Sequence, residues 1–283
     1  MKHIKIFTII ICLLFCISCN NTKNLNNKEE FNKGNESPSI TLDEKRNGTA
    51  DKIEGTTVII SIYANDELVT WNDNLENDIS KIDDTINNLR IATDYLTKAV
   101  AKYEKSAKFI YDWHENSDLR YEMTFKDNIV DNYNYKYDVQ REWIIDNIVI
   151  DKIKKKYAAD NIVFVYFFNT DNTNSAITST YNLDIDIVNV FPENSRYVVP
   201  PATYAHELLH TFGAPDLYYA NATINQEYVD YLSETNSKDI MFMVTDTSTI
   251  IDVFSDLDAY YVGLIDSHPD VDKWGLGISE HIK

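Results

Sequence analysis

Apolar residues follow strand-like and helix-like patterns in turn along most of the chain. Residues 57–63 form a β-branched, apolar run between turn-forming residues, which predicts a buried strand. From residue 75 to residue 105, apolar side chains recur at every third or fourth position, as on one face of a long amphipathic helix. Residues 161–168 (NIVFVYFF) are apolar at nearly every position and predict the strongest strand of the chain.

The other apolar segments complete a mixed order of elements. Residues 138–156 have a helical period and predict a second helix, with Trp143, Ile144, Ile148 and Ile153 on its apolar side. Four shorter segments predict further strands, namely 108–113, 119–125, 177–181 and 185–191. Because strands alternate with helices, we expect a fold of mixed α+β or α/β class, with a mostly parallel sheet and helices packed on it.

The first residues have the pattern of an export signal. A short basic start precedes an apolar run, residues 6–17, which is too short to span a bilayer but fits a secretory signal. The run ends in Cys-Ile-Ser-Cys, which resembles a bacterial lipoprotein cleavage box, although Cys16 stands where Leu is usual. We expect residues 1–18 to be a lipoprotein signal peptide and Cys19 to be lipidated, with ordinary signal cleavage as the alternative. The protein would then be exported and lipid-anchored to the bacterial membrane or cell surface.

A polar tether and one domain are expected after the signal. Residues 19–55 are rich in Asn, Lys, Glu, Ser and Gly without a sustained apolar period, so we expect them to form a flexible tether. Residues 56–283 then form one domain. All 3 cysteines precede residue 20, so no disulfide can form within this domain. An exported domain of this kind must be held by its core, by bound metal, or by both.

The charge of the chain narrows the range of partners. There are 26 Lys and Arg residues against 45 Asp and Glu residues, a net charge of -19. A surface this acidic repels phosphate backbones, so we expect no nucleic-acid partner.

The sequence HELLHTFGAPD carries the candidate chemistry. His206 and His210 are four residues apart, so on a helix their imidazoles lie on one face and can reach one metal ion. Glu207 sits about 100° further round the helix, where a carboxylate can take a proton from a metal-bound water. Gly213 can adopt the left-handed conformation that ends a helix. Asp216 then falls where a third ligand is needed.

Each residue of the motif also has a simpler interpretation. The histidines could be satisfied groups on a buried helix, and Asp216 could be a turn residue after proline. A different arrangement would take its third ligand from a following helix, where Glu227 and Glu234 are the available acids. The whole string is nevertheless expected by chance only about 10⁻⁵ times at the residue frequencies of this chain.

The motif resembles that of a known family. HELLHTFGAPDLY is similar to the zinc helix of the metzincin metallopeptidases, most of all to the immune inhibitor A type. The resemblance implies a zincin fold, with an upper subdomain of twisted sheet and long helices over about 56–213. A small lower subdomain over about 214–283 would hold a methionine turn beneath the zinc. Met241 is the candidate for that turn, with an ordinary core methionine as the alternative.

The sequence departs from the family pattern in two ways. The third ligand is an aspartate where histidine is commonest, and no tyrosine follows the methionine turn at the place that some members use. The group that stabilises the oxyanion, besides zinc, is therefore open.

The expected function is zinc-dependent hydrolysis of peptide bonds in extracellular proteins. One catalytic Zn²⁺ would be held by His206, His210 and Asp216, and Glu207 would act as general base and acid. The protein or peptide substrate would lie along an edge strand within 177–191. The alternatives are a non-catalytic, zinc-binding surface lipoprotein that binds a protein partner, and another hydrolase on the same scaffold.

Six further acids near the carboxyl end raise the question of a second metal. They could collect calcium, but they lack the spacing of a calcium loop, and a solvated acidic face is the simpler interpretation. These acids are Asp252, Asp256, Asp258, Asp266, Asp270 and Asp272.

Overall fold

The computed structural model describes residues 48–72, 74–112, 116–129, 137–170, 177–180, 183–193 and 198–282. The expected signal peptide, Cys19 and residues 20–47 of the expected tether lie outside these ranges. Among the described helices, none is long and apolar enough to cross a membrane.

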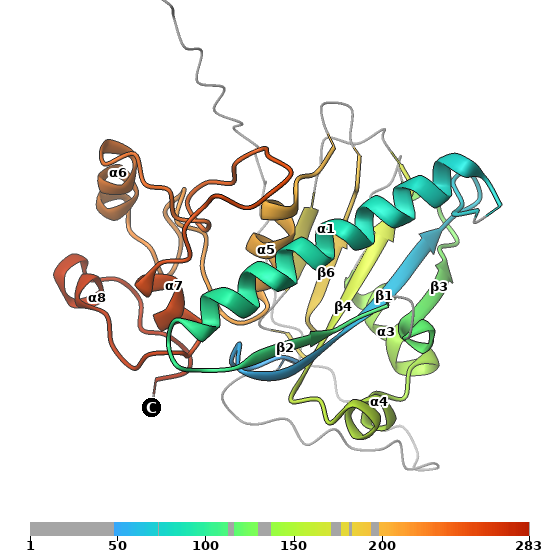
Figure 1. The fold of residues 1–283 in the computed structure, drawn as a ribbon, viewed down its shortest axis with the longest axis horizontal. Helices are drawn as coiled ribbons and strands as arrows, with labels where there is room; N and C mark the ends of the chain where they lie inside the picture. The colour runs from blue at the N-terminus through green and yellow to red at the C-terminus, as the bar shows by residue number, and fades with distance from the viewer. Residues whose placement is uncertain are drawn as a thin grey trace, which may run out of the picture. The chain divides into compact units, whose positions relative to one another are not determined.

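A 6-stranded sheet forms the centre of the fold, in the order β2-β1-β4-β6-β5, and β3 pairs with β1 beyond the end of β2 (Figure 1). Every pairing is parallel except that of β5 with β6. The strands are β1 (Gly55–Asn65), β2 (Ala107–Ile110), β3 (Arg120–Thr124), β4 (Asn161–Phe168), β5 (Ile177–Thr180) and β6 (Ile187–Val190). The predicted mixed α/β class and mostly parallel sheet are confirmed.

Helices cover both faces of the sheet. Side chains alternate across a strand, so β1 and β4 supply two separate cores. On one face, Ile59 and Val163 pack with apolar residues of α1 (Glu76–Ala101) and α5 (Pro201–His210). On the other face, Ile60 and Phe164 pack with residues of α3 (Tyr137–Asn147) and α4 (Ile150–Tyr157). Strands buried on both sides explain the unbroken apolar runs in the sequence.

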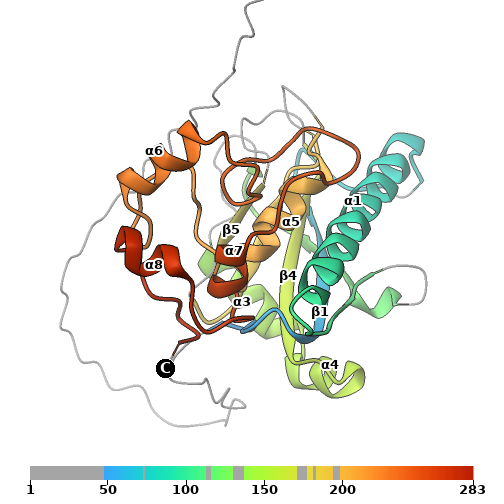
Figure 2. The same cartoon turned by 60° about the vertical axis from the view of Figure 1, so that its left-hand side comes forward.

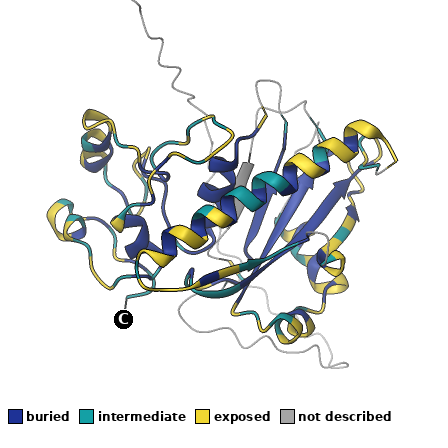
Figure 3. Cartoon of the chain, viewed as in Figure 1, coloured by how far each residue is buried: buried dark blue, intermediate teal, exposed yellow. Residues whose placement is uncertain are grey.

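The long helix α1 is amphipathic, as its period predicts. Its buried positions include Ile82, Ile86, Leu89 and Leu96, and its outer face is exposed towards both ends and partly exposed in the middle (Figure 3). The strands beneath it are buried in the same view. The sheet and α1 therefore form a rigid support for whatever lies on α5.

The single helix predicted over 138–156 is two helices. Asn147 ends α3 and donates a side-chain hydrogen bond to the Trp143 carbonyl (2.8 Å). The buried residues Ile144, Ile148 and Ile153 are spaced by four and then five positions. Because a step of five exceeds one helical turn, a break near residue 149 lets all three face the core.

The region after α5 contains three short helices that gather together beyond α5 (Figure 2). They are α6 (Gln226–Glu234), α7 (Asp256–Tyr261) and α8 (Pro269–Trp274). Each begins with a side-chain cap: the Asn225 side chain accepts from Tyr228 N, Ser255 and Asp258 form a capping box, and His268 accepts from Asp270 N. Caps of this kind favour short helices that could not form alone.

Residues 48–54, here called the strap, pack into the fold upstream of the domain boundary expected at residue 56. Ala50 and Ile53 are buried. The Ala50 amide donates to Asp186 (2.8 Å), and the Ile53 amide donates to the Val262 carbonyl (3.3 Å). The strap therefore joins the strand region to the region of the short helices.

Candidate metal centre

The helix that carries the motif is buried on all sides. Pro200 is extended, and Pro201 occupies the first helical turn, where its missing N–H leaves no hydrogen bond unmade. All 10 residues of α5 are buried, and Leu208 and Leu209 belong to the core shared with α1 and the sheet. The positions of side chains on this helix are thus fixed by packing.

The two histidines are oriented by backbone carbonyls. His206 Nδ1 lies 2.9 Å from the Ile240 carbonyl, and His210 Nδ1 lies 2.7 Å from the Ala214 carbonyl. A ring whose Nδ1–H donates to a carbonyl has its Nε2 available as a ligand. The two Nε2 atoms lie 3.2 Å apart, so both imidazoles point to one place.

Asp216 completes a triangle with the two histidines. Its Oδ1 lies 3.2 Å from Nε2 of His206 and 3.2 Å from Nε2 of His210. Three ligand atoms at about 2.0–2.2 Å from one ion, at tetrahedral angles, stand about 3.3–3.6 Å apart. The buried triangle therefore has the size and the donor atoms of a metal site, although these atoms do not specify zinc.

Gly213 turns the chain so that Asp216 returns to the helix. Its φ is +102°, a conformation that side chains with a Cβ rarely adopt. The Gly213 amide donates to the His210 carbonyl, and the Ala214 amide donates to the Leu209 carbonyl. The amide of Leu217 then donates to the Met241 carbonyl (3.0 Å), which holds the residue after Asp216.

The charges of the triangle stabilise one another when no metal is bound. Burial lowers the pKa of His206, but the hydrogen bond to Asp216 and the charges of Glu207 and Asp216 outweigh it and raise the pKa to about 9. Burial opposes ionisation of Asp216, yet its hydrogen bonds with His206 and His210 hold its pKa far below the ordinary value. The raised pKa of His206 favours a protonated ring at neutral pH, so metal binding would release a proton.

Glu207 is buried beside the triangle. The negative charge of Glu207 contributes to the raised pKa of His206 and to that of Tyr218, so its carboxylate lies near both side chains. It does not belong to the group of three ligand atoms. Glu207 is therefore close to the ligand atoms without being one of them.

A turn lies directly beside His206. The Phe242 and Met243 amides donate to the Asp239 carbonyl, and the Met241 amide donates to Asp239 Oδ1 (2.7 Å). The Met241 side chain is fully buried in the core that contains Leu217. Because Ile240 in the same turn accepts from His206, this turn fixes the orientation of one ligand.

Tyr218 is a neighbour of the site that the sequence analysis did not single out. Its ring stacks on the His206 ring, with centroids 6.2 Å apart, while the residue remains 52% exposed. Burial of its hydroxyl group and the charges of Asp216 and Glu207 raise its pKa. Tyr218 follows the motif in the sequence, two residues after Asp216. Its place beside the histidines, however, depends on the turn at Gly213.

The alternative ligands do not join the triangle. Glu227 and Glu234 are exposed on α6 and are absent from the group of three. The six carboxyl-terminal acids do not form a second group of three metal ligands in the described ranges. Two of them, Asp252 and Asp258, are buried and hydrogen-bonded to Thr245 and Ser255, so the expected solvated face is only partly exposed.

Comparison with known proteins adds little to this site. No protein family matches the sequence, and no curated protein does. One solved structure, described as a chaperone–substrate complex, is similar to this chain with 14% identity and a TM-score of 0.34. The match covers 61% of this chain but only 26% of the other. The chain thus spans about a quarter of that protein.

Proposed function

We propose that this protein is a zinc-dependent endopeptidase with a metzincin-like fold. The observation that carries the proposal is the buried triangle of His206, His210 and Asp216, with Glu207 beside it. A structural zinc site uses four protein ligands, whereas a catalytic site uses three and leaves one position for water or substrate. Three ligands and an adjacent carboxylate therefore favour catalysis over a purely structural role.

The residues fit the chemistry of peptide hydrolysis. When bound, zinc lowers the pKa of water and polarises the carbonyl group of the peptide bond. Glu207 accepts the proton of the attacking water and passes it to the leaving amine. The Ile240 and Ala214 carbonyls keep the two imidazoles in the ligand tautomer. Tyr218, half exposed beside His206, offers a hydroxyl donor to the oxygen that becomes negative in the transition state.

The zincin assignment rests on the order of elements and on the motif. A mostly parallel sheet and the long helix α1 precede α5, and a small region with a turn around Met241 follows it. The turn contacts a ligand through Ile240, which is the kind of support that a methionine turn gives. Among the described strands, the antiparallel β5 stands at the edge of the sheet, where an extended peptide would pair with it.

The signal-like start of the sequence supports an exported, lipid-anchored protein. Acyl chains on Cys19 would anchor it stably, because two or more chains are needed for lasting membrane attachment. A full-length Cys19→Ala variant should then leave the membrane fraction. If the variant still sediments with membranes, another anchor is present.

The activity is tested with the purified, zinc-loaded protein and a peptide library. We expect cleavage that a chelator stops and zinc restores. Glu207→Gln should keep about one zinc per chain but lose cleavage by several orders of magnitude, because the base is removed and the ligands stay. Glu227→Gln, the same change on the exposed face of α6, is the matched control and should cleave normally.

Two results would overturn the proposal. Full activity in Glu207→Gln would contradict the role of this carboxylate. Tight zinc binding without any chelator-sensitive cleavage would favour the non-catalytic zinc-binding lipoprotein.

A further inference from the structure

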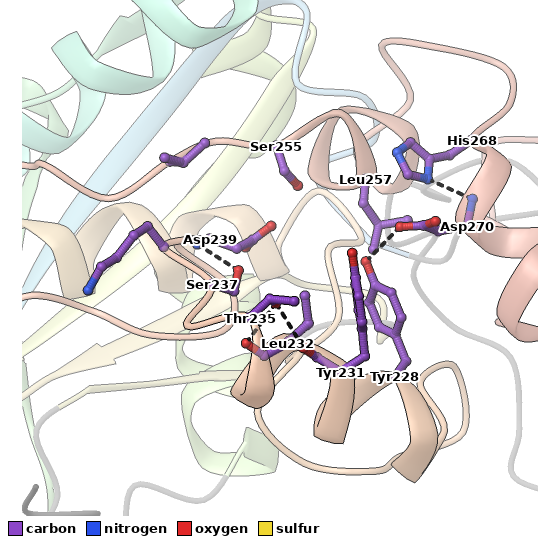
Figure 4. A pocket seen from close by; sticks show the side chains of 12 residues that line it. Tyr228, Tyr231, Leu232, Thr235, Ser237, Asp239, Ser255, Leu257, His268 and Asp270 are labelled. Carbon is purple, nitrogen blue, oxygen red and sulfur yellow. Dashed lines mark hydrogen bonds between the residues drawn. The ribbon is translucent and has the colours of Figure 1, made fainter.

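A cavity of about 290 Å³ lies among the short helices of the carboxyl-terminal region (Figure 4). Its walls come from α6, from the start of the turn at Asp239, from the segment before α7, and from the start of α8. None of the three metal ligands lines it, and neither does Glu207. It is therefore a separate place in the fold, and the proposed peptidase activity leaves it unexplained.

Hydrogen-bond acceptors converge on the centre of this cavity. Figure 4 shows the carboxylates of Asp239 and Asp270 on opposite sides of it, with the hydroxyl groups of Tyr228 and Tyr231 between them. Tyr228 donates to Asp270 Oδ2 (3.2 Å), which leaves lone pairs of both groups facing inward. Two carboxylates at one small cavity repel an anion.

One of the two carboxylates, that of Asp239, is buried. Asp239 is only 6% exposed, and its Oδ1 accepts from the Met241 amide. Behind it lies Asp258, which is 1% exposed. Burial raises the pKa of both acids, and the charge of Asp239 raises that of Asp258 further. A positive charge in the cavity would favour the ionised form of Asp239.

One of the aromatic residues that line the cavity, Tyr231, already has a cation beside its ring. Tyr228 and Tyr231 pack on Trp274, with centroids 5.7 and 4.9 Å from its ring. Lys273 places its ammonium group 5.3 Å from the Tyr231 ring and 4.8 Å from the Trp274 ring. Faces of electron-rich rings favour ammonium and guanidinium groups. Tyr228 and Tyr231, which line the cavity, are residues of the same electron-rich kind.

The two basic side chains that line the cavity have other contacts, so the carboxylates are available to a ligand. Lys238 is exposed, and its Nζ lies 3.8 Å from Met243 Sδ. His268 accepts from the Asp270 amide through Nδ1, so its neutral ring carries the proton on Nε2. A neutral apolar ligand would add no donor to the carboxylates beyond those from Met241 and Tyr228, and it would remove Asp270 from water, which is unfavourable. A metal ion lacks a third ligand here, since the described residues contain one group of three and it lies elsewhere.

We propose that this cavity binds an organic cation the size of one amino-acid side chain, with a guanidinium or ammonium group between Asp239 and Asp270 and against Tyr231. The volume supports that size, because it lies just below the range of about 300–1,000 Å³ typical of sites for larger ligands. The cation is either an arginine or lysine side chain of a polypeptide or a free amine. The proposal does not rest on the proposed peptidase activity, although Asp239 also belongs to the turn that contacts His206.

The proposal is tested by titrating the full chain with arginine amide at fixed ionic strength, using calorimetry and the fluorescence of the tryptophans, of which Trp274 packs on the lining residues Tyr228 and Tyr231. Citrulline amide keeps the α-amino group of arginine amide and replaces only the guanidinium by an uncharged ureido group, so it is the control for the side-chain charge. Asp270→Asn should weaken binding about 10-fold or more, as for a lost hydrogen bond to a charged group. Asp272→Asn changes the same charge on the exposed side of α8 and should bind as the unchanged protein does.

A second variant and a second probe complete the test. Tyr231→Leu keeps both carboxylates and should still weaken binding, which separates the aromatic contact from charge alone. Thermal unfolding checks that every variant is folded. A peptide with an internal arginine then distinguishes the sources: tighter binding than arginine amide indicates a polypeptide ligand, and equal or weaker binding indicates a free amine.

Three results would overturn the proposal. These are the absence of saturable binding of arginine amide to the unchanged protein, equal binding of citrulline amide, and equal losses in Asp270→Asn and Asp272→Asn.

Discussion

Replacing Gly213 by alanine tests whether the turn after α5 builds the metal site. At a φ of +102° a residue with a Cβ is strained by about 1–3 kcal/mol. The added Cβ would also lie 3.1 Å from the Tyr261 carbonyl oxygen and 2.5 Å from Glu280 Oε1. The Glu280 side chain can move, but the Tyr261 oxygen belongs to the backbone of a buried helix.

The free-energy costs of the backbone strain and of the crowding should add. Crowding in a packed region costs about 1–3 kcal/mol, so the variant should lose at least about 2 kcal/mol of unfolding free energy. The turn also carries the Ala214 carbonyl that orients His210. A shift of this carbonyl should weaken zinc binding about 10- to 100-fold, as is usual when a partner of a ligand is lost.

Urea unfolding of the metal-free protein and zinc titration measure the two effects separately. Gly275→Ala is the matched control, because its φ is also positive (+64°) and an added Cβ would meet nothing within 4 Å. It should lose about 1 kcal/mol and bind zinc normally. If both variants lose the same stability and neither loses zinc affinity, the turn does not build the site.

Three further predictions concern the ligands and their neighbours. Asp216→Ala should weaken zinc binding at least about 10-fold in a competition titration, whereas Glu227→Ala on α6 should leave it unchanged. In the metal-free protein the raised pKa of His206, about 9, should stabilise the fold fully below the unfolded pKa near 6.5. This stability should be lost as the pH rises from there through 9, which denaturation curves across that range would measure. If Asp216 did not stabilise the charged ring, the unfolding free energy would not change with pH in that range. Tyr218→Phe should lower kcat about 10²-fold or more with unchanged zinc content, because a donor to the oxyanion is lost; an unchanged kcat would remove the residue from the mechanism.

The elements that the sequence predicts best are those whose pattern is local. β4 has the bounds predicted from the sequence, 161–168. A strand that is buried on both faces is apolar at nearly every position, so its ends are easy to recognise. The relation between His206 and His210 needs only the helical period. The position of Asp216 was harder to predict, because it depends on the turn at a single glycine. That glycine could nevertheless be recognised in the sequence.

Features that depend on distant partners could not be predicted. The strap has the composition of a tether, and its partners Asp186 and Val262 are more than a hundred positions away. The acid at Asp258 was expected at the surface, because sequence alone does not reveal that it caps α7 from inside the core. The break between α3 and α4 could not be predicted for the same reason, because it depends on how both helices pack on the sheet.

The strap also determines the order in which this fold can form. Its Asp51 meets the His281 ring, and that ring also lies 2.9 Å from the carbonyl of Phe212, one residue before the turn at Gly213. The first and the final described segments must therefore come together before the metal turn is fully supported. Contacts of such long sequence separation slow folding. During synthesis the sheet and α1 can form early, but the contact of His281 with the Phe212 carbonyl can form only after residue 281 has emerged.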